Sequence, residues 1–319
     1  MLQRPPSPDR IIEAATVISP ELRDSPLHRH AGLDAAVGAH VLVKDETTGP
    51  VGSFKARGTD FLVARGVAAG EELVCASAGN FGQGLARSGT ARGHQVTVFA
   101  SINANPLKIE RMRKLGAEVR LSGADFDAAN AAAGEYAAGR PTARYIEDCD
   151  IPEVAEGAGT IARELTETGA AFDTFVVPVG GGALANGIGT WLRHTRPQCR
   201  IIGVGAAGAP ALHDSWHAGR LIETGSVDTI ADGIATRVPI AYAMTHLANT
   251  LDDFVLVEDA EMLAAMRLVM DTLGVVAEPS SASTIAAMLK LKGRLGRTVA
   301  TMLSGGNLTA EQKRAWLGA

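Results

Sequence analysis

Four short glycine-containing segments could do chemistry, three of them with a reactive or polar side chain and one with its backbone amides alone. In the first, Gly49–Gly58, two glycines and a proline predict an irregular turn, and Lys55 follows in the first turn of a helix that Ser53 could cap. Because cations are disfavoured at a helix N-terminus, we expect the pKa of the Lys55 amine to be lowered. A neutral amine is a nucleophile that can form a Schiff base. Taken alone, a solvated surface lysine is the simpler interpretation.

Two further segments place glycine-rich turns directly after predicted strands. Ser77–Gly84 opens a helix, and its backbone N–H groups could hold a carboxylate or a phosphate, while the Asn80 amide could reach a ring oxygen. Pro178–Leu184 repeats the arrangement and predicts a phosphate cradle at a helix N-terminus. Each of them, in isolation, could also be an ordinary turn between a strand and a helix.

The glycine run after Pro178 also satisfies the loose pattern of dinucleotide-binding loops, as Gly180-x-Gly182-x-x-Ala185. That pattern requires an acidic residue near the end of the next strand, where it holds a ribose. Here the next predicted strand ends at Val204-Gly205-Ala206, which contains no acid. The sequence therefore disfavours a nicotinamide cofactor.

The fourth segment, Leu303–Asn307, follows the last predicted strand. Ser304 would lie at the carboxyl end of a parallel sheet, which is where ligands of open α/β folds bind. Its hydroxyl group could share a hydrogen bond with a neutral ring nitrogen. By itself this segment is only a turn.

The elements that must position these segments alternate between short β-rich runs and longer alanine-rich helices. Strands are predicted at 72–77, 95–100, 118–121, 174–179, 200–204, 254–257 and 298–303, and helices at 80–90, 106–115, 125–138 and 259–273. Such alternation implies parallel strands with crossover helices. We therefore expect an α/β fold with two lobes of twisted, mostly parallel sheet flanked by helices. A small α/β domain at 71–146 would be inserted into a large domain formed by 1–70 and 147–319.

The composition narrows the class of protein. A net charge of −5 over 319 residues gives no basic footprint for nucleic acid. No stretch approaches the roughly 20 apolar residues of a membrane helix, and Met1–Arg10 lacks the apolar centre of a signal peptide. Three cysteines without a C-x-x-C pair fit a reducing compartment, so we expect a cytoplasmic protein. The last predicted strand ends close to the C-terminus, and we expect no appended regulatory domain.

Together and in this order, the four segments resemble the serine/threonine dehydratase branch of the fold type II (tryptophan synthase β-like) pyridoxal-phosphate-dependent enzymes, over nearly the whole chain. In that family the pattern G-S-F-K-x-R-G carries the Schiff-base lysine, and Gly52–Gly58 matches it. The S-A-G-N segment matches Ser77–Asn80, and the phosphate loop matches Gly180–Leu184. The serine that faces the pyridine nitrogen matches Ser304.

The resemblance implies that pyridoxal 5'-phosphate lies in the cleft between the lobes, with Lys55 as its covalent anchor and as the catalytic residue. The residues that it assigns to the cofactor are Phe54, Lys55, Asn80, Gly180, Gly181, Gly182, Ala183, Leu184, Glu278 and Ser304. Those that it assigns to the substrate are Ser77, Ala78, Gly79, Asn80 and Phe81. Weaker matches are Asn105-Pro106, Gly116–Val119 and Thr229–Ala235. The family tends to form dimers, so we expect a homodimer.

Some positions depart from the family's patterns. Lys55 is followed by Ala56-Arg57, whereas cysteine synthase-like enzymes and threonine synthases carry K-D-R, and this favours the dehydratase branch. Phe81 replaces the usual histidine, so the sequence does not determine which side chain the substrate has. Ala183 replaces a glycine, which is tolerable if its φ stays below zero. Ala78 replaces the serine that racemases use as a proton donor, so racemisation is disfavoured.

We predict no metal. Many relatives bind a divalent cation through acidic residues in the segment that matches 203–211, where this chain has Gly205 and Ala211 instead. His213 and His217, at i and i+4, could share a helical face and ligate zinc. Position 214 is Asp rather than the usual Glu and no third ligand is evident, so a partly exposed helix is the favoured interpretation.

The resulting hypothesis is a lyase that performs β-elimination on a β-hydroxy or other β-substituted amino acid, such as threonine or serine, to give a 2-oxo acid and ammonia. Lys55, freed by the incoming amino acid, would be the base at Cα. Ser304 would not enforce a protonated ring nitrogen, and the phosphate held by Gly180–Leu184 would supply the leaving group's proton. The alternatives are β-replacement, as in cysteine synthases, racemisation, and a catalytically silent protein that holds the cofactor.

Overall fold

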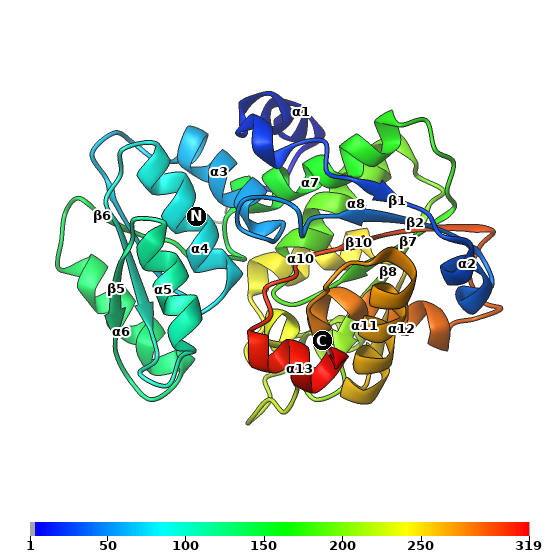
Figure 1. The fold of residues 1–319 in the computed structure, drawn as a ribbon. Coiled ribbons are helices and arrows are strands. Elements are labelled where there is room, and N and C mark those ends of the chain that lie inside the picture. Colours follow the sequence, from blue (N-terminus) through cyan, green and yellow to red (C-terminus); the bar gives the residue numbers. More distant parts are fainter. Residues whose placement is uncertain (1–3, 319) are drawn as a thin grey trace.

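The computed structural model describes residues 4–318 and contains two sheets, one in each of two lobes (Figure 1). The small sheet, on the left in Figure 1, has four parallel strands in the order β5-β4-β3-β6. The large sheet has six strands in the order β1-β2-β10-β7-β8-β9, and β1 is antiparallel to β2 while the other pairs are parallel. The expected α/β fold with two lobes of mostly parallel sheet is confirmed.

The small lobe follows the predicted alternation of strands and helices. Its strands are β3 (Glu72–Ala76), β4 (Val96–Ala100), β5 (Glu118–Leu121) and β6 (Ala143–Tyr145). Its helices are α4 (Asn80–Ala91), α5 (Pro106–Lys114) and α6 (Phe126–Ala138). Helix α5 begins at Pro106 because the Asn105 side chain accepts a hydrogen bond from the Leu107 amide at 2.9 Å, and Gly116, at φ 94°, lies just beyond its end.

The remaining strands form the large sheet. They are β1 (Leu27–His28), β2 (His40–Asp45), β7 (Thr174–Pro178), β8 (Arg200–Ala206), β9 (Asp253–Val257) and β10 (Thr298–Leu303). The remaining helices are α1 (Pro8–Val17), α2 (Ala31–Val37), α3 (Lys55–Gly66), α7 (Pro152–Glu167), α8 (Ala183–Thr195), α9 (Ala211–Ala218), α10 (Ala241–Thr250), α11 (Asp259–Leu273), α12 (Pro279–Lys290) and α13 (Ala310–Leu317). The short 3₁₀ helices are η1 (Pro20–Leu22) and η2 (Asp232–Ile234).

All seven predicted strands are present, while β1, β2 and β6 were not assigned from the sequence. Strand β2 determines where the segment that contains Lys55 leaves the large sheet. It pairs in parallel with β10, with Asp45 opposite Leu303 in the register. The chain segments that lead to Lys55 and to Ser304 therefore leave the same edge of the sheet from neighbouring strands.

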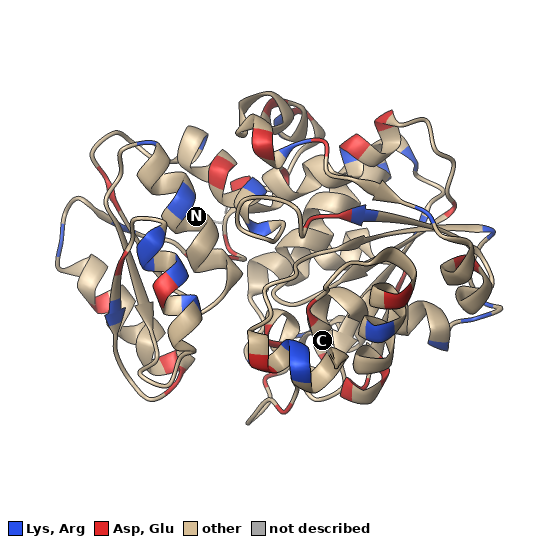
Figure 2. Cartoon of the chain, in the orientation of Figure 1, with Lys and Arg blue, Asp and Glu red and all other residues tan. Residues whose placement is uncertain are grey.

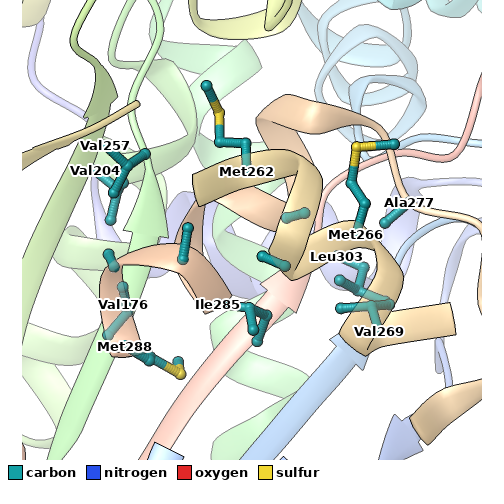
Figure 3. Close-up of a cluster of buried hydrophobic side chains, with 14 of the residues drawn as sticks. Val176, Val204, Val257, Met262, Met266, Val269, Ala277, Ile285, Met288 and Leu303 are labelled. Carbon is teal, nitrogen blue, oxygen red and sulfur yellow. The ribbon is translucent and has the colours of Figure 1, made fainter. Parts of the chain in front are cut away.

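A buried apolar cluster fixes the large sheet from one face (Figure 3). Met262 and Met266 of α11 and Ile285 of α12 are fully buried. They pack in the same cluster as Val204 of β8 and Leu303 of β10. Burying side chains of this size contributes about 1.5–3 kcal/mol each, so this cluster stabilises the packing of α11 and α12 on the large sheet.

Helix α3, which begins at Lys55, is held at close range to α7. A Cβ atom on Gly58 would lie 2.5 Å from the Val154 carbonyl oxygen, and one on Gly157 would lie 2.4 Å from the Arg57 carbonyl oxygen. The Arg57 side chain, 1% exposed, donates to both carboxylate oxygens of Glu46 at 2.7 and 2.9 Å. These contacts fix the direction in which α3 presents Lys55.

Lysine and arginine residues are interspersed with aspartate and glutamate along both lobes (Figure 2). Among residues 4–318, no helix is both long enough and apolar enough to cross a membrane.

All strands of the small sheet lie between Glu72 and Tyr145. The domain boundaries at 71 and 146 stay a prediction, and residues 1–3 and 319 lie outside the described part of the chain.

Candidate active site

The loops that carry Lys55 and Ser304 are bonded to each other through their backbones. The Phe54 amide donates to the Ser304 carbonyl oxygen at 3.0 Å, and the Gly306 amide donates to the Gly52 carbonyl oxygen at 3.0 Å. Ser53 and Gly305 form an antiparallel bridge between these two bonds. The lysine and the serine, which are far apart in the chain, are thus brought to one place.

The prediction that Ser53 caps α3 is wrong. The cap residue is Phe54, which makes no side-chain capping bond, and the Ser53 hydroxyl oxygen is buried without a partner in the described structure. The physical reason is that Ser53 pairs with Gly305 in a β-bridge. The helix therefore begins one residue later than expected, and Phe54 occupies the cap position.

The Lys55 side chain points into a partly aromatic, partly acidic environment. Its Nζ atom lies 5.1 Å from the centroid of the Phe54 ring and 5.8 Å from that of the Phe81 ring. It also forms an ion pair and hydrogen bond with a carboxylate oxygen of Asp148. The side chain is 18% exposed, so a ligand can still reach it.

The predicted direction of the Lys55 pKa is also wrong. Burial has the largest single effect and lowers the pKa of the amine, but the Asp148 charge, the electrostatic interaction with Cys149 and the hydrogen bond to Asp148 together raise the pKa above its ordinary value. A carboxylate in direct contact therefore has more influence than the partial positive charge of the helix N-terminus.

The Ser77–Phe81 segment forms a turn with free space beside its backbone. The Ser77 hydroxyl oxygen accepts hydrogen bonds from the amides of Gly79 at 3.2 Å and Gly82 at 3.0 Å. A Cβ atom on Gly79 would have no heavy atom within 4 Å. Phe81 is 5% exposed and packs in the core of the small lobe. The backbone of this turn therefore has open space beside it at Gly79.

A hydrogen-bonded triangle joins the small lobe to the large lobe beside this turn. The Asn80 amide nitrogen donates to the two carboxylate oxygens of Glu278 at 3.0 and 3.2 Å. Asn307 donates from its side chain to the Asn80 oxygen at 2.8 Å and from its backbone to Glu278 at 2.9 Å. Burial and the charge of Asp232 raise the pKa of the Glu278 carboxyl group.

The glycine loop, residues 180–182, lies at the N-terminus of α8 and beside Cys149. Gly182 caps the helix at φ 102° without a side-chain bond. A Cβ atom on Gly181 would lie 2.1 Å from the Cys149 sulfur, and one on Gly180 would lie 2.6 Å from the Gly233 carbonyl oxygen. Asp24 is the one non-glycine with positive φ among the described residues, so Ala183 meets the condition set for it.

Leu184 follows in the first turn of α8 and is buried. The first amides of a helix have no intrahelical partner, and the helix dipole favours an anion there. The N-terminus of α8 is thus built for a phosphate or a similar anion. Gly233 belongs to the weaker match Thr229–Ala235, which the structure places against this loop.

Two residues at the site were not identified from the sequence. Asp148 and Cys149 follow β6, and they contact Lys55 and the glycine loop respectively. Burial, followed by the charge of Asp148, raises the pKa of the Cys149 thiol to about 12. The sequence signal for them is the acidic run Glu147-Asp-Cys-Asp150, although the strand before it, β6, is not predicted.

His213 and His217 lie on α9, as expected for a helix. Their ring centroids are 4.2 Å apart, and His213 is hydrogen-bonded to Asp214 at 2.8 Å. Within residues 4–318, no group of three or more His, Cys, Asp or Glu side chains is arranged to hold a metal ion. The absence of a metal in the protein stays a prediction.

A family profile described as "Pyridoxal-phosphate dependent enzyme" matches residues 18–305. The chain belongs to this family. It is 34% identical over 290 residues to the L-threonine dehydratase biosynthetic IlvA of Pasteurella multocida, covering 89% of this chain and 56% of that protein. It is 35% identical over 286 residues to the L-threonine ammonia-lyase of Geobacter sulfurreducens, covering 88% of this chain and 70% of that protein. The chain thus spans little more than half of the first relative.

Among solved structures, a threonine deaminase from the organism abbreviated T.th. has a TM-score of 0.90 to this chain, with 30% identity and coverage of 95% of this chain and 99% of that one. The fold is therefore that of the fold type II pyridoxal-phosphate enzymes. Pyridoxal phosphate is the cofactor of the family, and the site fits it. The uncapped N-terminus of α8 suits the phosphate, and the partly exposed amine of Lys55 suits the aldehyde.

Proposed function

We propose that the protein catalyses β-elimination on a β-hydroxy or other β-substituted amino acid, such as threonine or serine, and releases a 2-oxo acid and ammonia. One observation carries the proposal: the Lys55 amine lies 5.8 Å from the ring centroid of Phe81, in the turn Ser77–Phe81, and bonds to Asp148, whose neighbour Cys149 packs against Gly181 of the glycine loop. The names of the two relatives, a threonine dehydratase and a threonine ammonia-lyase, support the same reaction.

Each loop has a separate task in this proposal. The amides at the start of α8, from Gly180–Leu184, would hold the cofactor phosphate. Asn80 and Glu278 would orient the ring, and Ser304 would offer a neutral hydroxyl group to its nitrogen. The amides of Ser77–Phe81 would hold the substrate carboxylate at the open space beside Gly79.

Lys55 would move the proton. When bound, the cofactor withdraws electrons from the substrate's Cα. The amine of Lys55, released by the incoming amino acid, would remove the proton at Cα and keep it on Nζ. The bond from Cβ to the hydroxyl group would then break, and the oxygen would leave as water with a proton from the phosphate group that Gly180–Leu184 would hold. The proton on Lys55 would finally replace the one that the phosphate gives up. Hydrolysis of the remaining unsaturated amine gives the 2-oxo acid and ammonia.

The residues around Lys55 favour elimination over racemisation. Racemisation needs an acid on the opposite face of Cα, and the corresponding position holds Ala78, which cannot donate a proton. β-Replacement would need a second nucleophile to bind after the leaving group departs. A catalytically silent protein would need no ordered site, whereas here the lysine, asparagine and serine loops are hydrogen-bonded to one another.

The test is an assay of the purified protein, loaded with pyridoxal phosphate, on threonine or serine without any other reactant. We expect ammonia and the 2-oxo acid in equal amounts, and none from the Lys55→Ala variant. Product that forms only when a thiol or an amine is added would assign β-replacement instead. A protein that reacts with no member of an amino-acid panel would be the silent cofactor holder.

We further propose that the protein is a cytoplasmic homodimer. Its cysteines, Cys75, Cys149 and Cys199, are each buried and unpaired, which suits a reducing compartment. Light scattering of the eluted protein tests the assembly: a mass near twice the 33.1 kDa of one chain is expected. A mass of a single chain would refute the dimer.

A further inference from the structure

The contact between Lys55 and Asp148 connects two elements that are far apart in the chain. Lys55 is the first residue of α3, and Asp148 lies shortly after the end of β6. Nζ of the lysine donates to one carboxylate oxygen of Asp148. The other oxygen, Oδ1, is buried and has no hydrogen-bond partner in the described part of the chain. Lys55 is therefore the group that compensates the Asp148 charge.

The other titratable groups around the pair do not supply that charge. Burial and the Asp148 charge raise the pKa of the thiols of Cys149, from the same segment, and of Cys75, from β3, so neither thiol carries a charge near pH 7. Glu147 is acidic as well, and burial raises the pKa of its carboxyl group. Asp150 follows in the same segment and adds a further negative charge. The Lys55 ammonium is thus the cation that directly contacts Asp148.

We propose that Asp148 is a positioning residue that keeps a proton on the nitrogen of Lys55, both on the free amine and on the lysine–cofactor linkage of the resting enzyme. A carboxylate in contact with a basic nitrogen stabilises its protonated form, and the effect is stronger in a buried site. This inference rests on the proposed role of Lys55. If Lys55 leaves the cofactor as a neutral amine, the adjacent carboxylate makes that amine a stronger base towards Cα.

The Lys55–Asp148 contact also accounts for the proton that Lys55 takes from Cα. The C–H bond at Cα breaks, an N–H bond forms on Lys55, and the new ammonium is the partner that Asp148 already holds in this structure. The Asp148 carboxylate neither gains nor loses a proton. Its effect is to hold the transferred proton on Lys55 instead of letting it return to Cα.

The test is a pH titration of the visible absorbance of the resting holoenzyme, which reports the protonation of the linkage and needs no turnover. We expect the Asp148→Asn variant, which keeps the shape and removes the charge, to lose the proton at a pH about 1–3 units lower than the wild type. Asp148→Glu should restore part of the shift. Glu147→Gln removes a carboxyl group next to Asp148 that does not contact Lys55. This control variant should move the midpoint of the absorbance titration much less.

Unchanged midpoints in a folded Asp148→Asn variant would overturn the proposal. If that variant fails to retain the cofactor, the apoprotein answers the same question through the pKa of Lys55 itself, followed by NMR after reductive methylation of lysines. A Lys55 pKa equal to that of the wild type would again overturn the proposal. The result is separable from the reaction type, because the absorbance shift is expected even if the enzyme performs replacement or no reaction at all.

Discussion

The amide nitrogen of Asn80 lies 3.0 Å from a carboxylate oxygen of Glu278, a residue 198 positions further along the chain. Asn80 begins α4 in the small lobe, and Glu278 is the cap residue of α12 in the large lobe. Asn307 bonds to both of them and is itself bonded by Arg111 of α5 at 2.9 Å. A small polar network therefore joins the two lobes, in addition to the apolar cluster that they share.

Removing the Asn80 amide should weaken this network. We expect Asn80→Ala to lower the free energy of unfolding by about 1–3 kcal/mol, because the buried Glu278 loses a donor, and to weaken retention of pyridoxal phosphate. Urea unfolding of the apoprotein and a cofactor titration measure the two effects. Asn249→Ala, on an exposed helix face, is the matched control and should change neither.

The Glu278 carboxyl group should make the stability depend on pH. Its pKa in the folded protein is raised above the ordinary 4.5 by burial and by Asp232, so the folded state binds a proton that the unfolded chain releases. Stability contributed by this group is present below pH 4.5 and is lost as the pH rises through the raised folded value. Glu278→Gln should remove this slope in a series of unfolding measurements, and an unchanged slope would contradict the assignment.

The buried Arg57 should be among the strongest contributors to stability near the site. It pairs with Glu46 and Glu164 and donates to Thr160 at 3.0 Å. Removing one partner of such a network leaves charges uncompensated, so Arg57→Ala should cost about 3–5 kcal/mol in urea unfolding. Arg65 pairs with Glu13, and the Arg65 side chain is 45% exposed, so Arg65→Ala should lower the free energy of unfolding by less than about 1 kcal/mol. Similar costs for the two variants would refute the network's importance.

The glycine loop should tolerate no side chain at Gly181. The Cβ atom of Gly181→Ala would lie 2.1 Å from the Cys149 sulfur, so the loop must move and affinity for pyridoxal phosphate should fall by at least tenfold, about 1.4 kcal/mol. Adding Cys149→Ala removes the sulfur and should recover much of the lost affinity. If the double variant binds as poorly as the single one, the clash is not the cause.

Ser304 should influence which products form. A carboxylate at this position favours protonation of the ring nitrogen, which a hydroxyl group does not enforce. We expect Ser304→Asp to lower the ratio of 2-oxo acid to side products, as measured by chromatography of the reaction mixture, while Ser304→Thr preserves it. An unaltered ratio in Ser304→Asp would show that Ser304 does not face the ring nitrogen.

The sequence predicted the parts of the site that lie at strand ends. Because strands and glycine turns leave local patterns, the Asn80, Gly180 and Ser304 segments are predicted at strand ends from the sequence. The strand that precedes the Lys55 segment, β2, is not predicted. The contact of Lys55 with Asp148 spans 93 positions and follows no periodicity, so no local pattern reveals it.

The two local errors have the same origin. Ser53 was expected to cap α3, but a bridge to Gly305 determines its backbone. The pKa of Lys55 was expected to fall, but the Asp148 carboxylate raises it. In both cases a tertiary contact outweighs a helix-end preference, and such contacts appear only once the chain is folded.

The central claim is that Lys55 is the covalent anchor of pyridoxal phosphate, and borohydride trapping tests it most directly. Reduction of the holoenzyme followed by proteolysis and mass spectrometry should find the pyridoxyl group on the peptide that contains Lys55. The Lys55→Ala variant should carry no such label, whereas Lys114→Ala, which alters a 72%-exposed lysine, should be labelled like the wild type. A label on another lysine of the wild type, or an undiminished label in Lys55→Ala, would contradict the account.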